Sequence, residues 1–363
     1  MTPPSTSAST TRGRADTSAG AVKTLGILTG GGDCPGLNPV IRAVTRRAIQ
    51  AGISVIGIRN GWKGLIEADT IALDLRSVSG ILPRGGTILG TSRTNPYKTP
   101  EDVARLKETW KTLKLDALIA VGGEDTLGVA TKLVNEGLKV VGVPKTIDND
   151  LSMTDYSFGF DTALNIAMEA IDRLHTTAES HHRIMVAEVM GRHAGWIATG
   201  AGIAGGADVI LIPEVPIDLD AVCEIIKKRH ARGKDFSIVV VAEGAKLKNS
   251  ADVTVEEKLD EFGHVRLGGI GHLLGGFIEQ RTGFETRVTV LGHLQRGGSP
   301  TAFDRILGTR FGVKAVELVL EGKFGHMVSL QGNKIVSVRI EEGTGTLKTV
   351  DMDLYNIAKV FFG

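Results

Sequence analysis

The fold is decided by a stretch near the start of the chain, TLGILTGGGDCPGLNPVIRAVTRRAIQ, which covers residues 24–50. It begins with an apolar run of strand length, passes through three consecutive glycines, and continues with apolar residues at helical spacing over 37–50. A second apolar run follows at 54–58. A strand, a helix and another strand in this order predict a parallel sheet with helices packed on its faces.

The same alternation continues along the rest of the chain. We expect further strands at 117–121, 139–143, 184–189, 209–212, 237–242 and 288–291, helices at 102–113, 125–134, 162–175 and 302–320, and a β-rich tail at 328–340. Parallel sheets of this kind bind ligands at the carboxyl ends of their strands. Since no Pro- or Ser-rich linker divides the chain after residue 21, two domains would be joined by several crossings and would share a cleft.

Composition and charge limit the classes of function. The chain has 363 residues, of which 42% are apolar and 23% charged, and this is typical of a soluble globular protein. A formal net charge of +1 predicts neither a nucleic-acid partner nor a membrane partner, and no apolar run approaches the roughly 20 residues of a membrane span. Cys34 and Cys223 give neither a disulfide framework nor metal-ligand spacing, which predicts a cytoplasmic protein.

Two segments fall outside the alternating pattern. Residues 1–21 lack the apolar central region of a secretory signal, so we expect a disordered N-terminal extension. An organellar targeting peptide is the alternative, against which Asp16 and the lack of amphipathic periodicity argue. Residues 246–269 are polar and charged, and we interpret them as a surface insertion.

Two glycine loops follow predicted strands. TGGGDCPG (29–36) is neither of the two common nucleotide-binding fingerprints, but its backbone N–H groups and the following helix suit an anion. A plain tight turn is the alternative. GGEDT (122–126) places Glu124 and Asp125 at the start of a helix, where they either cap the helix or hold Mg²⁺ together with phosphates.

A third loop, PKTIDND (144–150), follows the strand at 139–143. Asp148 can take the proton from an attacking hydroxyl, while Lys145 and Thr146 can bind a phosphate in transfer. Phosphoryl transfer requires alignment and charge neutralisation more than covalent chemistry from the protein. The loop therefore predicts phosphoryl transfer, with a polar turn as the alternative.

Together with other motifs, these loops resemble the bacterial 6-phosphofructokinase family from about residue 25 to residue 324. The motifs that carry the resemblance are GGGDCPGLN (30–38), RGGTILGTSR (84–93), GGED (122–125), PKTIDND (144–150), HHRIMVAEVMGRHAGW (181–196), IPEV (212–215), VVVAEGA (239–245) and VTVLGHLQRGGSPTAFDR (288–305). The resemblance implies an α/β fold of two similar three-layer α/β/α domains, with mostly parallel sheets and an active-site cleft between them. It assigns 22–158 plus 294–344 to the phosphoryl donor, and 159–293 plus 345–363 to the sugar phosphate.

The resemblance also implies residue roles. Asp148 would be the general base on the sugar 1-hydroxyl, Thr146 and Arg192 would assist catalysis, and Glu124 would bind the cofactor Mg²⁺. The donor side comprises Gly31, Gly32, Arg93, Asp125 and Lys145. The sugar side comprises Thr146, Asp148, Asp150, Arg183, Met190, Gly191, Arg192, Glu243, Arg287, His293 and Arg296. In bacterial relatives the arginines that match Arg183 and Arg287 reach across from a neighbouring subunit, which implies a homodimer or homotetramer.

Two departures from the family pattern concern the donor. ATP-using relatives carry Gly at the position of Asp125, and commonly also at the position of Lys145. A carboxylate about 4 Å from the α-phosphate of ATP would cost roughly 4 kcal/mol at an effective dielectric near 20. Pyrophosphate has no third phosphate and no nucleoside, and the pair resembles the pyrophosphate-dependent branch of the family. Trp62 matches an aromatic residue that stacks on adenine, so the ATP-dependent reaction remains the alternative.

The predicted reaction is reversible phosphoryl transfer from pyrophosphate to fructose 6-phosphate, giving fructose 1,6-bisphosphate in glycolysis or gluconeogenesis. A different phosphosugar, such as sedoheptulose 7-phosphate, stays open, whereas the intact Asp148 argues against a noncatalytic regulatory subunit. Arg42 and Arg46 match part of the family's effector site. Leu75 and His175 stand where relatives have Arg, so we expect little allostery.

Overall fold

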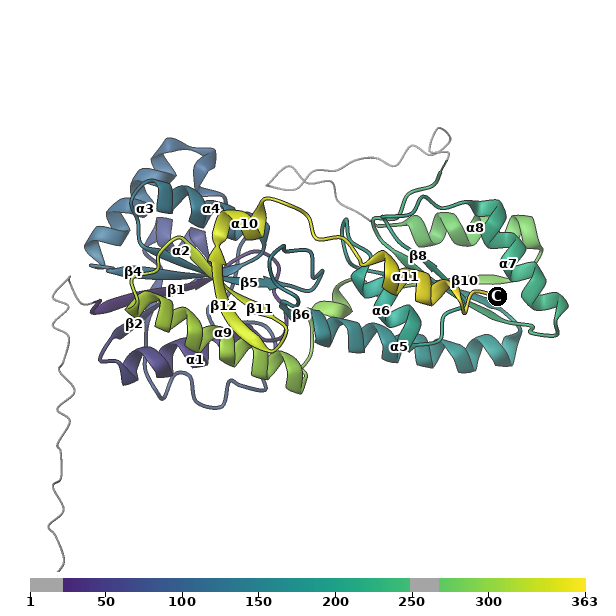
Figure 1. Cartoon of the computed structure of the whole chain (residues 1–363), viewed down its shortest axis with the longest axis horizontal. Helices are drawn as coiled ribbons and strands as arrows, with labels where there is room; N and C mark the ends of the chain where they lie inside the picture. Colours follow the sequence, from purple (N-terminus) through teal and green to yellow (C-terminus); the bar gives the residue numbers. More distant parts are fainter. Residues whose placement is uncertain (1–21, 249–267) are drawn as a thin grey trace, which may run out of the picture.

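The structure is a computed structural model that describes residues 22–248 and 268–363. Predictions for residues 1–21 and for most of the 246–269 segment lie outside the described residues. The described chain forms two lobes, each built around its own sheet (Figure 1). Over these described ranges, no helix is long and apolar enough to cross a membrane.

The first lobe contains a mixed sheet with the strand order β12-β11-β5-β4-β1-β2-β3, and β6 pairs with β5. All pairs are parallel except the two at the edges, β2–β3 and β11–β12. The strands are β1 (Thr24–Thr29), β2 (Ser54–Ile58), β3 (Thr70–Leu73), β4 (Ala117–Gly122), β5 (Val140–Thr146), β6 (Phe158–Gly159), β11 (His326–Gln331) and β12 (Lys334–Arg339). The central strands β4 and β5 are buried along their whole length, as expected for parallel strands covered on both faces.

Helices cover both faces of this sheet. One layer consists of α1 (Leu37–Gln50) and α9 (Ala302–Leu320), which lie below the sheet in Figure 1. The other layer contains α2 (Trp62–Glu67), α3 (Pro100–Thr112), α4 (Glu124–Asn135) and α10 (Ile340–Thr344). The helices α1 and α9 come into backbone contact at Gly312, where a Cβ atom would lie 2.8 Å from the carbonyl oxygen of Val40. A larger residue at 312 would push these two helices apart.

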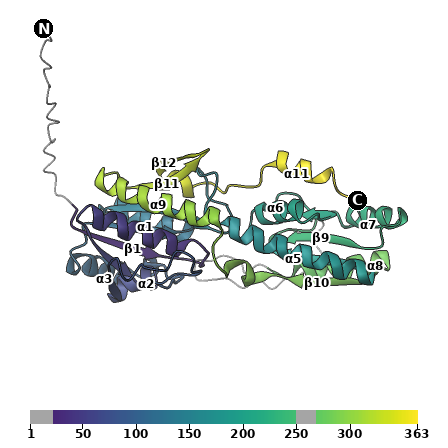
Figure 2. The same ribbon diagram turned by 90° about the horizontal axis from the view of Figure 1, so that it is seen from below.

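The second lobe contains a fully parallel sheet with the order β10-β7-β9-β8. Its strands are β7 (Ile184–Val189), β8 (Val209–Leu211), β9 (Ser237–Ala242) and β10 (Thr286–Val290). The helices α5 (Phe160–His181) and α6 (Trp196–Ala204) pack on one face, and α7 (Leu219–Ala231) and α8 (Ile270–Thr282) pack on the other. A last helix, α11 (Met352–Lys359), lies beside α6 (Figure 2).

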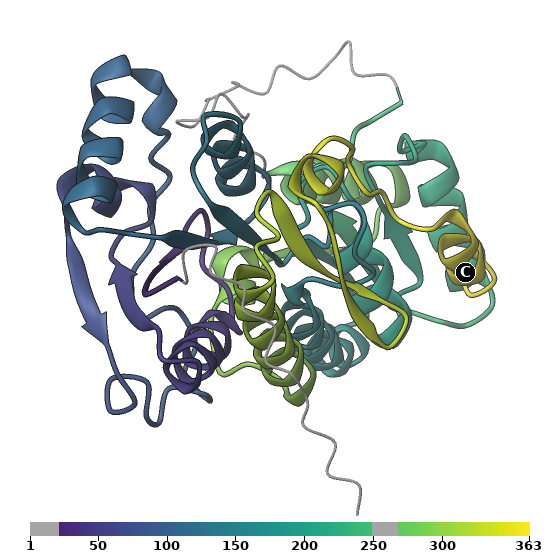
Figure 3. The same cartoon turned by 60° about the vertical axis from the view of Figure 1, so that its left-hand side comes forward.

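Within residues 22–248 and 268–363, the chain passes between the lobes three times. It crosses where β6 leads into α5, returns through the short helix η3 (Gly292–Arg296) to α9, and crosses again between α10 and α11 (Figures 1 and 3). The predicted fold class is confirmed, since each lobe has a mostly parallel sheet between helical layers. We propose that the lobes are the two predicted domains, 22–158 plus 294–344 and 159–293 plus 345–363.

Candidate active site

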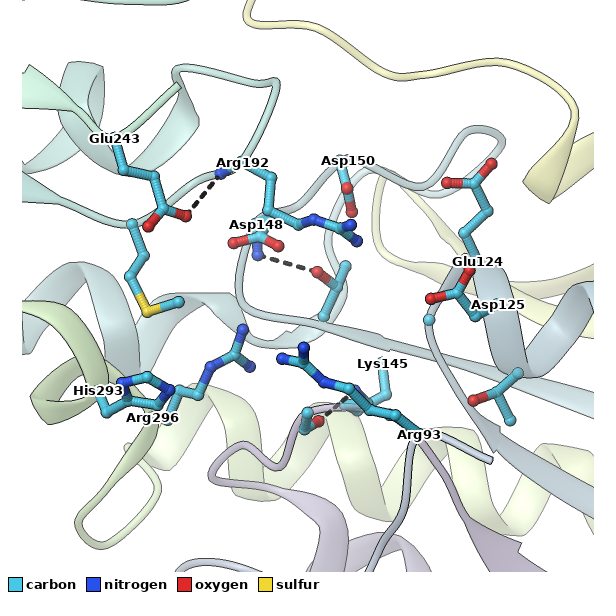
Figure 4. A pocket seen from close by; sticks show the side chains of 16 residues that line it. Arg93, Glu124, Asp125, Lys145, Asp148, Asp150, Arg192, Glu243, His293 and Arg296 are labelled. Carbon is cyan, nitrogen blue, oxygen red and sulfur yellow. Dashed lines mark hydrogen bonds between the residues drawn. The ribbon is translucent and has the colours of Figure 1, made fainter. Parts of the chain in front are cut away.

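A cavity of about 500 Å³ lies between the two lobes. Loops at the carboxyl ends of strands from both sheets contribute to its wall (Figure 4). The lining residues are Gly31, Gly32, Arg93, Gly123, Glu124, Asp125, Thr126, Lys145, Thr146, Asp148, Asp150, Met190, Arg192, Glu243, His293 and Arg296. The structure therefore brings together most of the residues that the sequence predicted for the donor and sugar sides.

Asp148 lies at the centre of this cavity, in the loop after β5 (Figure 4). Its side chain is buried, and its backbone N–H donates a hydrogen bond to Oγ1 of Thr146 at 3.0 Å. Burial and the neighbouring Asp150 raise the pKa of Asp148 to about 6, against the opposing effects of Arg296, Arg192 and Lys145. Its Oδ1 atom has no hydrogen-bond partner among the described residues, so this oxygen can accept a proton.

Asn149 shapes the loop that presents Asp148, although no role was predicted for it. Its φ angle of 53° lies in the left-handed region, which Asn tolerates better than most residues. Its Oδ1 accepts from the N–H of Ser157 at 3.1 Å, and Ser157 Oγ donates to the carbonyl of Thr146 at 2.8 Å. These bonds hold the turn closed beneath the two cavity carboxylates. The role of Asn149 could have been predicted from its position, because it follows a strand and stands between two acidic residues.

Lys145 links β5 to the glycine loop after β1. Its Nζ donates to the carbonyl oxygen of Gly32 at 2.5 Å, and its side chain is buried. Burial lowers the pKa of Lys145, since desolvation disfavours the charged ammonium. The ammonium lines the donor side of the cavity. An anion bound there would favour the charged form of Lys145 and so oppose the effect of burial.

The glycine loop differs in one detail from the predicted anion cradle. The N–H of Gly31 donates to the carbonyl oxygen of Ser92 at 3.1 Å, so this amide is already engaged. At Gly32, a Cβ atom would lie 2.5 Å from Nη1 of Arg296, and the same Nη1 donates to the carbonyl of Asp33 at 3.2 Å. Gly32 thus makes room for an arginine. Arg296 was predicted on the sugar side, and in this structure its guanidinium contacts the donor loop.

Glu124 and Asp125 occupy the first turn of α4, after Gly123 at the N-cap position. Glu124 is exposed and Asp125 is half-buried, and both face the cavity. Because Gly123 has no side chain, the capping interpretation fails in its strict form, although carboxylates in a first turn still favour the helix dipole. Thr126, which the sequence did not single out, is buried and lines the cavity beside them.

The sugar side is built by loops after β7 and β9. Gly191 and Arg192 have positive φ angles of 143° and 51°, and the second value is uncommon for a residue with a side chain. The N–H of Arg192 donates to Oε1 of Glu243 at 3.2 Å, which fixes the turn. Burial, and then the charge of Asp148, raise the pKa of Glu243. The guanidinium groups of Arg93, Arg192 and Arg296 all point toward the middle of the cavity (Figure 4).

Three predicted sugar-side residues, Gly191, Arg183 and Arg287, are not among the described residues that line the cavity. Arg183 immediately precedes β7 and Arg287 is the second residue of β10, so both lie at the amino-terminal edge of the sheet. The cavity lies at the opposite edge, roughly 15–20 Å away along strands of this length. Both arginines contact Glu285, Arg183 at 2.9 Å, and the hydrogen bond from Arg183 lowers the pKa of Glu285. Within one chain these two arginines cannot reach the cavity.

Three residues were linked by the sequence to donor choice or regulation, and the structure shows the surroundings of each. Trp62 is 2% exposed and packs in the core beside α3 and β4, so it does not offer a free ring face to a ligand. His175 shares a hydrogen bond of 2.7 Å with the carbonyl oxygen of Gly205, and its ring packs edge-on against Phe236. Leu75 is exposed.

Residues 24–319 match a family model described as phosphofructokinase, and this range is most of the chain. The chain belongs to the phosphofructokinase family. A Streptomyces coelicolor protein named pyrophosphate–fructose 6-phosphate 1-phosphotransferase is 60% identical over 93% of this chain and 99% of its own length. An ATP-dependent 6-phosphofructokinase 3 of the same organism is 52% identical over 90% of this chain and 96% of its own. A solved pyrophosphate-dependent phosphofructokinase from Marinobacter aquaeolei has a TM-score of 0.77, with 25% identity, and covers 92% of this chain and 86% of that one.

Proposed function

We propose that this phosphofructokinase-family chain transfers a phosphoryl group from pyrophosphate to the 1-hydroxyl of fructose 6-phosphate. The products are fructose 1,6-bisphosphate and phosphate. The reaction is reversible because pyrophosphate and the products are similar in free energy. One observation carries the proposal. Asp125 and Lys145 line the donor side of the same cavity that contains Asp148. Asp148 is buried, and its Oδ1 atom has no hydrogen-bond partner among the described residues.

In this mechanism Asp148 accepts the proton of the 1-hydroxyl as that oxygen attacks phosphorus. A base must be ionised to act, and a pKa near 6 leaves the carboxylate charged at neutral pH while keeping it basic. The cavity arginines supply the second requirement, because charge on the transferring group has to be neutralised. Arg93 lies on the donor side and Arg192 on the sugar side, while Arg296 extends from beside His293 to the donor loop (Figure 4).

The donor assignment rests on shape and charge at Asp125. A carboxylate there repels the α-phosphate of ATP but leaves room for a two-phosphate donor, for which Lys145 supplies a buried counter-charge. The more similar Streptomyces coelicolor relative has the pyrophosphate name, and the less similar one has the ATP name. The buried position of Trp62 removes the one feature that favoured adenine stacking.

The residues of the cavity also fit Mg²⁺, which we propose as the cofactor. Within the described ranges, no three His, Cys, Asp or Glu side chains converge to form a site that the protein could complete alone. Mg²⁺ usually takes one or two carboxylates and leaves its other positions to phosphates and water. Glu124 is the proposed protein ligand, and the bound ion would neutralise phosphate charge. Burial, and in smaller part the charge of Glu124, raise the pKa of Asp150, so these two carboxylates are close enough to interact.

The two arginines at the far edge of the second sheet suggest the assembly. We propose a homodimer or homotetramer in which Arg183 and Arg287 reach the sugar 6-phosphate in the cavity of a neighbouring subunit, with His293 and Arg296 binding it from the same chain. A dianionic phosphate is best bound by several guanidinium groups. Small-molecule substrates alone are proposed as ligands, and the cytoplasm as the location.

Purified protein should be assayed with fructose 6-phosphate and Mg²⁺, once with pyrophosphate and once with ATP. We expect turnover with pyrophosphate that exceeds turnover with ATP by orders of magnitude. Product phosphate added to fructose 1,6-bisphosphate should drive the reverse reaction. Turnover with ATP alone would overturn the donor assignment and leave the sugar assignment standing. Replacing fructose 6-phosphate by sedoheptulose 7-phosphate tests the acceptor.

A further inference from the structure

The last crossing between the lobes, residues 345–350, runs directly over the loop that carries Asp148 and Asp150. It leaves α10 and passes across the gap to α11 in Figure 1. Leu347 pairs with Leu151 in an antiparallel bridge, and the N–H of Lys348 donates to the carbonyl oxygen of Asp150 at 2.9 Å. The crossing is therefore held by an isolated β-bridge and a backbone hydrogen bond against the segment that follows the proposed base.

Lys348 makes several further contacts at this crossing. Its Nζ donates to the carbonyl oxygens of Thr154 at 2.8 Å and of Asp155 at 2.6 Å. The same Nζ lies 5.0 Å from the centroid of the Trp196 ring, and the backbone carbonyl of Lys348 accepts from Nε1 of Trp196 at 3.1 Å. Burial lowers the pKa of Lys348 to about 8, although Asp155 and Asp150 oppose this shift. One side chain thus contacts the 150–155 loop of the first lobe and the start of α6 in the second.

The sugar-side loop is held by the same crossing. Residues 190–195 run from the end of β7 to the start of α6, and they include Met190 and Arg192 of the cavity wall. Glu214 accepts from the N–H of Gly195 at 3.0 Å and from the N–H of Val350 at 2.8 Å with one oxygen. The loop is therefore fixed at its far end to a residue only two positions from Lys348.

We propose that Lys348 is a positioning residue that holds the Asp148 loop of one lobe at a fixed distance from the Arg192 loop of the other. Lys348 does not line the cavity, so it contacts neither substrate and acts only through these two loops. Phosphoryl transfer needs both loops aligned at the moment of reaction, whereas binding of each substrate depends mainly on its own side. The idea deepens the proposed function and rests on it.

The test compares Lys348→Met with Lys359→Met. Both lysines place Nζ 5.0 Å from an aromatic centroid in the C-terminal region, but Lys359 lies over Tyr355 in α11, away from the 150–155 loop. Misplacement of reacting groups by about 1 Å can cost about 100-fold in rate, so we expect Lys348→Met to lower kcat about 10- to 100-fold. KM for fructose 6-phosphate and for pyrophosphate should change by less than about threefold, and Lys359→Met should resemble the unchanged protein.

Two further variants keep the test decisive if Lys348→Met folds poorly. Lys348→Arg keeps a positively charged hydrogen-bond donor and should retain most of the kcat of the unchanged protein. Trp196→Leu removes the ring and should lower kcat by a larger factor than it changes KM. An unchanged kcat in folded Lys348→Met, or an equal loss in Lys359→Met, would overturn the proposal. If the protein proves to use ATP, the same kcat comparison is made with ATP, so failure of the donor assignment and failure of the positioning role give different results.

Discussion

The donor side and the sugar side of the cavity differ in how completely one chain builds them. All predicted donor residues line the cavity, and they come from the loop after β1, the first turn of α4 and the end of β5, together with Arg93. On the sugar side, His293 and Arg296 line it, but Arg183 and Arg287 lie at the opposite edge of the second sheet and contact Glu285. One chain therefore contains the transfer machinery but only part of the proposed 6-phosphate site.

This difference predicts where each kind of substitution should act. A change on the donor side should alter chemistry or donor choice whatever the oligomeric state. A change in the remote arginines should alter sugar binding only when a neighbouring subunit is present. The joint between the lobes should affect neither side separately. The predictions test these three statements in order of the expected effect on turnover.

The largest effect is expected for Asp148→Asn. An amide cannot accept the proton of the 1-hydroxyl, and loss of a general base typically costs about 10²- to 10⁴-fold in rate. Because the amide keeps the size of the carboxylate, KM for fructose 6-phosphate should change little. Steady-state kinetics check this, with Asp353→Asn on the exposed side of α11 as the control. Activity within tenfold of the unchanged protein would remove Asp148 from the role of base.

Asp125→Gly should open the donor side to ATP. The carboxylate is half-buried, so the repulsion is screened below the roughly 4 kcal/mol estimated for a pair at about 4 Å, and we expect kcat/KM for ATP to rise about 10- to 1,000-fold. Glu124→Gly removes the neighbouring carboxylate from the same helical turn and serves as the matched control. It should weaken turnover with both donors because it removes the proposed Mg²⁺ ligand. An unchanged response to ATP in Asp125→Gly would mean that donor choice lies elsewhere.

Arg287→Ala tests whether the sugar side is completed by a second chain. Loss of a charged hydrogen bond to phosphate costs about 1.5–3 kcal/mol, so KM for fructose 6-phosphate should rise about 10- to 100-fold. KM for pyrophosphate should stay within about twofold. In oligomers that mix Arg287→Ala chains with Asp148→Asn chains, some sites combine the intact Asp148 of one chain with the intact Arg287 of the other. Mixing the two variants should therefore restore part of the activity. A rise in KM in a preparation shown by light scattering to be monomeric would contradict the cross-subunit assignment.

The fold was predicted best where one local pattern determines the structure. The helix expected at 37–50 and the strands expected at 54–58 and 237–242 have the observed limits, since their apolar spacing is unambiguous. The helix α6 was missed because it has almost no polar face, and α7 was missed although Asp218 caps it and the helix is amphipathic. The helix expected at 162–175 continues to His181 because polar residues do not end a helix that packs on one side only.

The sequence predicted the loops that line the cavity, but not the contacts that hold these loops in place. Each loop carries its polar residues within a few positions, so strand ends and residue types were enough to single out Asp148, Lys145 and Glu124, which all line the cavity. The contacts of Lys348 join positions that are more than 150 residues apart in sequence, and no local pattern records them. The contact of Arg296 with Gly32 could not be predicted for the same reason, because the two residues are far apart in sequence.

Asp304 at the joint between the lobes should have the smallest effect on turnover. It lies in the first turn of α9, and its Oδ2 accepts from the N–H of Thr162 at 2.9 Å and from Oγ1 of Thr162 at 2.5 Å, near the start of α5. Its Oδ1 is buried and lacks a partner among the residues with described positions. Burial raises the pKa of Asp304 to about 6, although the hydrogen bonds from Thr162 oppose the shift.

The sign of the pH effect follows from this raised pKa. Between pH 3.8, the ordinary pKa of an aspartate, and about pH 6, the folded state binds more protons than the unfolded state, so the contribution of Asp304 to stability is complete below pH 3.8 and is lost as pH rises through 6. Asp304→Asn stays neutral and keeps an oxygen acceptor for Thr162. Relative to the unchanged protein, the free energy of unfolding of the variant should therefore rise by about 1–3 kcal/mol between pH 4 and pH 7. Urea unfolding at the two pH values measures this difference, and kcat and both KM values should stay within about twofold. Equal differences at both pH values would show that Asp304 is not protonated in the folded protein, and a selective change in one KM would show that the joint is coupled to one side of the cavity.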